Sequence, residues 1–203
     1  MGMRFLTALV ACLAVLASCA PNVPAEMKPD FDRVMARGES LTDAEKAEIT
    51  ALAQPENLKR FLGNTTSRSF SYQHGTQVEY LGADGRAFLW YPGNDKLVPG
   101  TWTASLSGRR PQICFGYDIR AKIRDDYMSE TSRKNLAAKG PLISRECQPA
   151  RVYLLTREEI VDGDPLRLGS GKMPFELSKE NAPLSELARR AGRSQRMTNK
   201  ITW

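Results

Sequence analysis

Apolar and polar positions along the chain follow three kinds of pattern. Residues 5–17 (FLTALVACLAVLA) form an almost continuous apolar run. Residues 42–62 place apolar side chains at helical spacing, whereas residues 64–156 hold short apolar and aromatic stretches separated by turn residues. A change from a helical period to short alternating segments predicts a few helices followed by β-strands.

Two helices are predicted ahead of the strands. Thr42 and Glu45 form a capping box, in which each side chain bonds the backbone N–H of the other residue, so a helix starts here and runs to about residue 54. A second helix, residues 55–62, opens on a proline and ends at a glycine. We expect both helices to pack on a sheet. The apolar stripe of the second helix is Leu58, Phe61 and Leu62.

The strand-like segments are rich in Val, Tyr, Phe and Trp. Asp-Gly, Gly-Asn and Ser-Gly pairs at 84–85, 93–94 and 107–108 supply turns between them. Strands at this spacing predict an antiparallel meander, either a sheet or a small barrel. Further strands are expected at 146–156 and, less regularly, at 166–177, and a short helix at 183–192. The predicted fold class is α+β. The segments read as strands are QVEYL, ADGR, AFLWYPGN, LVPGTWTASLSGRR and QICFGYD.

The N-terminal apolar run predicts export. It follows Arg4 and is too short to span a bilayer as a helix, which needs about 20 residues, but it has the form of a secretory signal peptide. Residues 16–19 (LASC) resemble the bacterial lipobox, in which the Cys thiol takes a diacylglyceryl group, the peptide is cut before that Cys, and the new amine is acylated. The resemblance implies a signal peptide at 1–18 and lipid on Cys19. The alternative is ordinary cleavage after Ala20, which would release a free periplasmic protein.

The remaining chain is divided into three parts. Residues 19–38 are the lipidated Cys and an extended tether, because residues 20–32 hold three prolines and no helical period. Residues 39–180 form the β-rich globular domain, and residues 181–203 form the C-terminal helix and a basic tail. Ala20, rather than Asp, follows the lipidated Cys, which under enterobacterial sorting favours the periplasmic leaflet of the outer membrane.

The cysteines agree with export. Cys12 leaves with the signal peptide and Cys19 takes lipid, so Cys114 and Cys147 remain as two thiols in an oxidising compartment. We expect a disulfide between them. The alternative is two buried free cysteines, and no CxxC motif or neighbouring His indicates a reactive thiol.

Five segments together resemble a family of small exported alphaproteobacterial proteins. They are FLGNTTS, EYLGADGRAFLWYPGN, PGTW, ICFGY and ECQPARVY, and they span residues 61–153. The resemblance implies a compact β-rich domain with Cys114 and Cys147 paired, and it implies no reaction. Two parts depart from the family pattern: the long charged connection at 118–146 and the chain after position 157. The connection is a candidate contact surface.

Few residues offer catalytic or metal chemistry. His74 is the single histidine and lies outside any nucleophile motif, which excludes a multi-His metal site and leaves a hydrolase using His74 as a minor alternative. We expect no metal and no cofactor. The carboxylate pairs at 125–126 and 158–159 are interpreted as solvated surface, because neighbours in an extended segment point opposite ways. Core packing is expected to explain most aromatic residues of the strands, and an exposed row is the alternative, a possible surface for sugar or peptide made of Trp90, Tyr91, Trp102 and Tyr117.

The charge favours an envelope partner. The formal net charge is +6, and basic residues gather near the C-terminus, where they would suit anionic headgroups or envelope polymers. Nucleic acid is not expected, since no recognition motif is present. The predicted function is a membrane-anchored binding or structural module of the cell envelope, facing the periplasm. An inhibitor of an envelope-directed enzyme, similar to lysozyme inhibitors, is the alternative. The basic residues are Arg189, Arg190, Arg193, Arg196 and Lys200.

Overall fold

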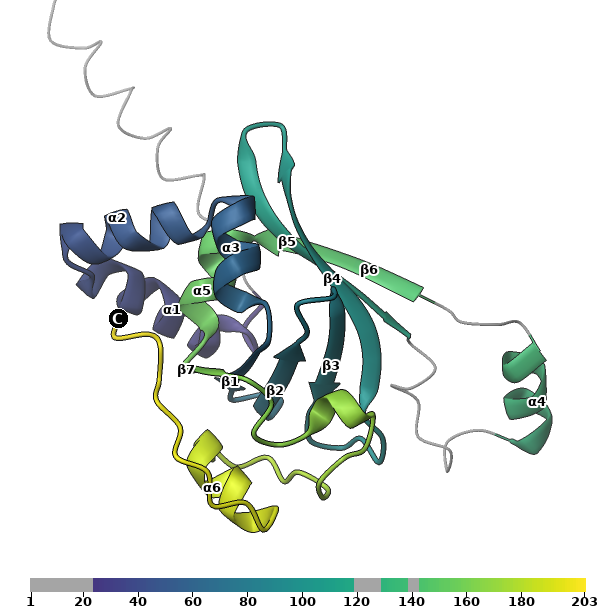
Figure 1. Cartoon of the computed structure of the whole chain (residues 1–203). Helices are drawn as coiled ribbons and strands as arrows, with labels where there is room; N and C mark the ends of the chain where they lie inside the picture. The colour runs from purple at the N-terminus through teal and green to yellow at the C-terminus, as the bar shows by residue number, and fades with distance from the viewer. Residues whose placement is uncertain (1–23, 119–128, 139–142) are drawn as a thin grey trace, which may run out of the picture.

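A seven-stranded antiparallel sheet forms the centre of the protein (Figure 1). The computed structural model describes residues 24–118, 129–138 and 143–203, and the sheet order is β6-β5-β4-β3-β2-β1-β7. The predicted α+β class is confirmed. The strands are β1 (Thr65–Ser71), β2 (Gly75–Leu81), β3 (Arg86–Trp90), β4 (Val98–Ser107), β5 (Arg110–Asp118), β6 (Ile143–Pro149) and β7 (Glu159–Asp162). The helices are α1 (Lys28–Ser40), α2 (Asp43–Leu52), α3 (Pro55–Leu62), α4 (Glu130–Ala138), α5 (Ala150–Thr156) and α6 (Leu184–Arg190).

Strands β1 to β6 follow each other as a meander, as predicted for β2 to β6. Each pairs antiparallel with the next, and the β2–β3, β3–β4 and β4–β5 turns fall where the glycine pairs stand. Gly85 and Gly108 have φ values of +84° and +59°, a conformation that glycine adopts without a Cβ penalty. The Asp84 carboxylate also accepts the Arg86 backbone N–H at 3.1 Å, which fixes the β2–β3 turn.

Strand β1 was not predicted, because its sequence TTSRSFS is mostly polar. It lies between β2 and β7, and its first five residues are buried. Its hydroxyl groups are satisfied inside the protein: Thr65 donates to the Leu62 carbonyl at 2.7 Å, and Thr66 donates to the Gly163 carbonyl at 2.8 Å. Internal hydrogen bonds of this kind allow a polar strand to occupy a buried position.

The helices expected at 42–54 and 55–62 are present as α2 and α3. The capping box of Thr42 and Glu45 is formed in both directions. The tether expected at 19–38 is wrong in its second half, because α1 begins at Lys28. Pro29 stands in the first turn of α1, where its missing N–H costs no helical bond. Arg37 of α1 donates to the carbonyls of Leu155 and Arg157, which holds the helix against the end of α5.

Two strand predictions require correction. The segment 146–156 is a strand only to Pro149, after which α5 begins, because Pro149 at the N-cap has no N–H to continue the ladder. The segment 166–177 forms no strand. It contains one short 3₁₀ turn, η4 (Leu168–Ser170), and its apolar side chains cover the sheet instead of extending it. Strand β7 was missed, being only four residues long.

The core has one layer on each face of the sheet. Helices α3 and α5 pack on one face, against β4 and β5, and α2 packs on these two helices. The other face is covered by the chain between β7 and the end of α6, with Trp90 and Phe88 beneath it. Trp90 and Tyr91 contact opposite layers, as alternation along a strand requires. None of the described helices has both the length and the apolar character needed to cross a membrane.

The C-terminal helix is confirmed as α6, but the basic tail is not simply solvated. The Lys200 backbone N–H donates to the Ile160 carbonyl at 2.7 Å, and the Lys200 ammonium lies 2.8 Å from Asp162. Ile201 is buried in the core. Arg189 and Arg190 form ion pairs with Glu186 and Glu180. Three of the five basic residues therefore have acidic partners within the protein.

Candidate functional site

As predicted, core packing explains most of these aromatic side chains, and the alternative of an exposed aromatic row is not formed. Trp90 and Trp102 are buried, and each indole N–H donates to a backbone carbonyl, that of Phe175 at 3.0 Å and that of Gly82 at 2.9 Å. Their alternation on the strands turned them into the two core layers. Tyr91 and Tyr117 are different, because both line an open cleft on the helical face of the sheet.

The cleft lies beside the core that α2, α3 and α5 form on this face, and it shares Leu89, Phe115 and Tyr117 with that core. Its volume is about 550 Å³, which lies in the range of small-molecule sites. Strand β2 shows how the sequence produces it: Gln77, Glu79 and Leu81 point to the same face, Leu81 enters the core, and the two polar residues line the cleft. The other strand residues that line it are Leu89, Tyr91, Phe115, Tyr117, Glu146, Cys147 and Gln148.

A buried carboxylate lies at the floor of the cleft. Glu79 is 6% exposed and receives three hydrogen bonds: from the Tyr117 hydroxyl at 2.9 Å, from the Tyr153 hydroxyl at 3.1 Å and from Arg157 Nη1 at 3.0 Å. Tyr153 comes from α5, and its hydroxyl also lies 3.3 Å from that of Ser67 on β1. Side chains from β5, from α5 and from the residue after α5 therefore converge on one carboxylate of β2.

Arg157 is the cation of this group. It follows α5 directly, is 7% exposed, and its guanidinium lies over the Tyr153 ring at 4.2 Å from the centroid. Only Nη1 has a hydrogen-bond partner among the described residues, and Nε is buried without one. Because Nε is buried, a ligand in the cleft could reach only the remaining N–H groups of the two Nη atoms, which bond to no described residue other than Glu79.

Burial keeps the two tyrosines protonated. It raises the pKa of Tyr153 and of Tyr117 well above the ordinary value, and the Glu79 carboxylate beside them raises the pKa of each hydroxyl further. Both phenols therefore donate to Glu79 throughout the neutral range. The floor carries one negative and one positive charge, on Glu79 and Arg157, and these form an ion pair.

A second cavity continues the cleft towards α1. Its volume is about 240 Å³, and it shares His74, Gln77, Gln148 and Arg157 with the first. His74 lies in the exposed β1–β2 turn at the junction. Its backbone N–H donates to Ser71 Oγ at 2.9 Å, and among the described residues its ring has no hydrogen bond to a Ser or an Asp. The geometry gives the hydrolase hypothesis no support.

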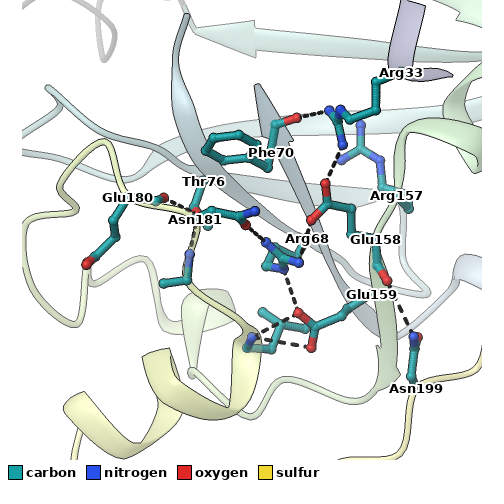
Figure 2. A network of polar contacts seen from close by, with 12 residues as sticks. Arg33, Arg68, Phe70, Thr76, Arg157, Glu158, Glu159, Glu180, Asn181 and Asn199 are labelled. Atoms are coloured by element: carbon teal, nitrogen blue, oxygen red, sulfur yellow. Dashed lines mark hydrogen bonds and ion pairs between the residues drawn. The ribbon is translucent and has the colours of Figure 1, made fainter. Parts of the chain in front are cut away.

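A polar network behind the cleft holds α1, β1 and β7 together (Figure 2). Arg68 of β1 donates to Glu158, Glu159 and Asn181, each at 2.5 Å. Arg33 of α1 also pairs with Glu158. The interpretation of Glu158 and Glu159 as solvated surface is therefore wrong. The two side chains point to opposite sides of an extended segment, but both bond to the same arginine of β1. The pair at 125–126 lies outside the described residues.

The disulfide Cys114–Cys147 is confirmed. The two cysteines stand opposite each other in the β5–β6 register, so the bond attaches the edge strand β6 to the sheet. Strand β6 carries Glu146 and Gln148 into the cleft. The disulfide consequently fixes one wall of the site. Residues 119–128 and 139–142 of the 118–146 connection, and Cys19 with its signal segment, lie outside the described residues.

Comparison with protein-family models, with curated proteins and with solved structures found no match to this chain. The lipobox and the resemblance to exported alphaproteobacterial proteins therefore stay predictions. Within the described chain, no group of three or more His, Cys, Asp or Glu side chains is arranged to hold a metal ion.

Sequence reasoning missed the three residues that define the site: Glu79, Tyr153 and Arg157. One signal was available for Glu79. In the predicted strand QVEYL, Leu81 is the core-facing residue, and Glu79 stands two positions before it on the same face. A charged residue on an inward face is a marker of a paired or functional group. No local pattern indicated that Arg157 would reach it, 78 positions along the chain.

Proposed function

We propose that the protein is a lipid-anchored module of the bacterial cell envelope that binds a small polar ligand in the cleft above Glu79 and Arg157. The observation that carries the proposal is the buried ion pair at the floor of an open cleft, with donors of Arg157 unused. Removing two charges from water costs several kcal/mol per ion in real proteins, and well-packed apolar residues of similar volume are often as stabilising. The pair is therefore better explained by a ligand than by stability.

The anchor part of the proposal is supported by the sequence. Residues 5–17, the LASC match and the two remaining cysteines are consistent with export and acylation of Cys19. Several acyl chains on one Cys would hold the protein at the membrane, whereas one chain binds only marginally. The short segment between Cys19 and α1 would then keep the cleft close to the bilayer, on the periplasmic side and preferably at the outer membrane.

The intact mass of the protein extracted by detergent from its own membranes, measured without reductant, tests the anchor. A chain starting at Cys19 with acyl groups supports it, and Cys19→Ala should abolish the acylated form. An unlipidated chain starting at Pro21 would overturn the anchor.

A separate measurement tests the cleft. The melting temperature of the extracted protein is recorded with and without the dialysable products of an enzymatic envelope digest. We expect a rise for the wild-type protein and none for Arg157→Met. Equal behaviour of the two proteins, with the variant folded by circular dichroism, would contradict binding at the cleft.

A further inference from the structure

The unused hydrogen-bonding groups of the cleft include both donors and acceptors. Gln77 and Gln148 are half-buried, and neither side-chain amide bonds to another described residue. Arg157 contributes free N–H donors, and Glu79, with three of about four acceptor positions occupied, keeps one free. A ligand group that both donates and accepts suits such a surface, and the hydroxyl group is the simplest one.

The charges of the cleft favour an uncharged ligand. Glu79 and Arg157 already neutralise each other at the floor. An anion or a cation placed beside them would add an unbalanced charge to a partly dry site, and that is costly. Glu146, the other carboxylate of the lining, stands on the exposed part of β6 and has an interaction partner of its own.

Apolar surface lies beside these polar groups. Phe115 and Tyr117 are neighbours on the same face of β5, with ring planes inclined by 4° and centroids 5.7 Å apart, and Leu89 and Tyr91 line the cleft from β3. A sugar ring presents C–H groups on its faces and hydroxyl groups around its edge. Aromatic side chains combined with polar groups that fix orientation are complementary to that shape.

The topology disfavours an extended peptide at the floor. Peptides commonly add to a sheet through backbone hydrogen bonds at an open edge. The sheet residues at the floor come from β2, β3 and β5, and each of these strands is paired on both sides, whereas the edge strand β6 forms a wall of the cleft. The floor therefore offers side chains rather than backbone groups.

We propose that the cleft binds an uncharged oligosaccharide, with Glu79, Arg157, Gln77 and Gln148 bonding its hydroxyl groups and the aromatic wall contacting a ring face. This rests on the proposed function of the cleft as a ligand site. The class is defined by its chemistry, and the envelope contains glycans both as free fragments and within polymers.

Isothermal titration of the detergent-extracted full-length protein tests the class of ligand. The probes are the neutral trisaccharides maltotriose, cellotriose and N,N′,N″-triacetylchitotriose, with trigalacturonate as the charged sugar and a neutral alanine-glycine peptide of similar mass. We expect saturable binding of at least one neutral trisaccharide with a Kd of about 1 mM or lower, and none of the peptide. An insoluble glycan that binds while its soluble trisaccharide does not identifies the polymer as the source and also supports the proposal.

Variants locate the binding. Gln148→Leu should weaken it by about 5–10-fold, the loss expected for one or two neutral hydrogen bonds, and leave the fold unchanged because this amide has no partner within the described protein. Gln195→Leu changes an exposed glutamine outside the cleft and should have no effect. Arg157→Met should abolish binding. If Arg157→Met does not fold, the effect of Gln148→Leu decides whether the sugar binds in the cleft.

Three results overturn the proposal. Binding of the peptide or of trigalacturonate without any neutral glycan would replace the ligand class and leave the cleft as a site. A neutral glycan that binds Gln148→Leu and Arg157→Met as well as wild type would place the sugar elsewhere. If no glycan binds and the envelope digest also leaves the melting temperature unchanged, the proposed function fails together with its ligand class.

Discussion

Arg68 is the residue whose loss should most weaken the attachment of β7 and α1 to the sheet. It is 7% exposed and donates to two carboxylates and one amide that arrive from distant parts of the chain (Figure 2). The substitution Arg68→Met keeps the length and the apolar stem of the side chain while it removes the charge and all three hydrogen bonds. The negative charges of Glu158 and Glu159 would then repel each other with one positive charge fewer beside them.

The size of the effect follows from the burial of the three groups. Removing one partner of a fully buried ion pair costs about 3–5 kcal/mol. The Glu158 and Glu159 side chains are 20% and 21% exposed, and Arg33 still pairs with Glu158, so water and a second cation reduce the penalty. We expect Arg68→Met to lower the free energy of unfolding by about 2–3 kcal/mol. That is a large part of the stability of an ordinary domain.

Urea unfolding with the disulfide intact, followed by tryptophan fluorescence, measures this loss. Trp90 and Trp102 are buried and will report on both core layers. The matched control is Arg86→Met, because the Arg86–Asp84 pair is 61% and 53% exposed and, being screened by water, should contribute much less to stability. If Arg68→Met costs no more than Arg86→Met, with equal denaturant dependence, the network does not hold the fold as we infer.

Three further predictions concern other parts of the molecule. Replacing Cys114 and Cys147 by Ser should lower the free energy of unfolding by roughly 3.5–4 kcal/mol, because the bond closes a loop with a sequence separation of 33; an unchanged urea midpoint would contradict this. The pKa of Tyr117 and of Tyr153 is raised only in the folded protein, so the unfolded chain releases these protons first and stability should fall as pH rises past about 10. Tyr153→Phe should make that fall shallower in urea midpoints between about pH 8 and 11, and the same slope in both proteins would refute it. Gly38→Ala should raise the melting temperature, with a gain of about 0.5–1 kcal/mol, because a Cβ there has space inside α1 and meets only Leu155 at 3.7 Å; a lower melting temperature would show that the helix is constrained there.

Most elements with local signals were predictable. The capping box at Thr42 determines the start of α2, and the glycine turns determine the meander, because both act within a few residues. Strand β1 escaped because its burial depends on β7, which supplies the partner for Thr66 from almost a hundred positions away. Pro149 shows the same limit: a helix follows because Ala150 and Leu154 meet a core that the local sequence does not reveal.

The candidate site was less predictable than the fold. Cys114 and Cys147 were found by counting, and Tyr91 and Tyr117 were named among the aromatic residues, but the floor of the cleft was missed. A residue on a strand can point to either face of the sheet. Which face stays open depends on the segments that cover the sheet. Sequence pattern gives the alternation, whereas the choice of face depends on where α5 and its Arg157 finally lie.

The place of β7 beside β1 affects the order in which the chain can fold. Strands β1 to β5 join through short turns, so their contacts are local and can form early. The outer edge of β1 pairs with β7, which lies far along the chain, as the Thr65–Asp162 pair shows. Closing the loop between the two strands costs conformational entropy before any contact between them forms. Until then, β1 exposes unpaired backbone groups that can template pairing with another chain. A ribosome- or translocon-arrested chain that stops before Glu159 should therefore self-associate through β1, and the aggregation hazard of this protein lies in that interval rather than in its finished fold.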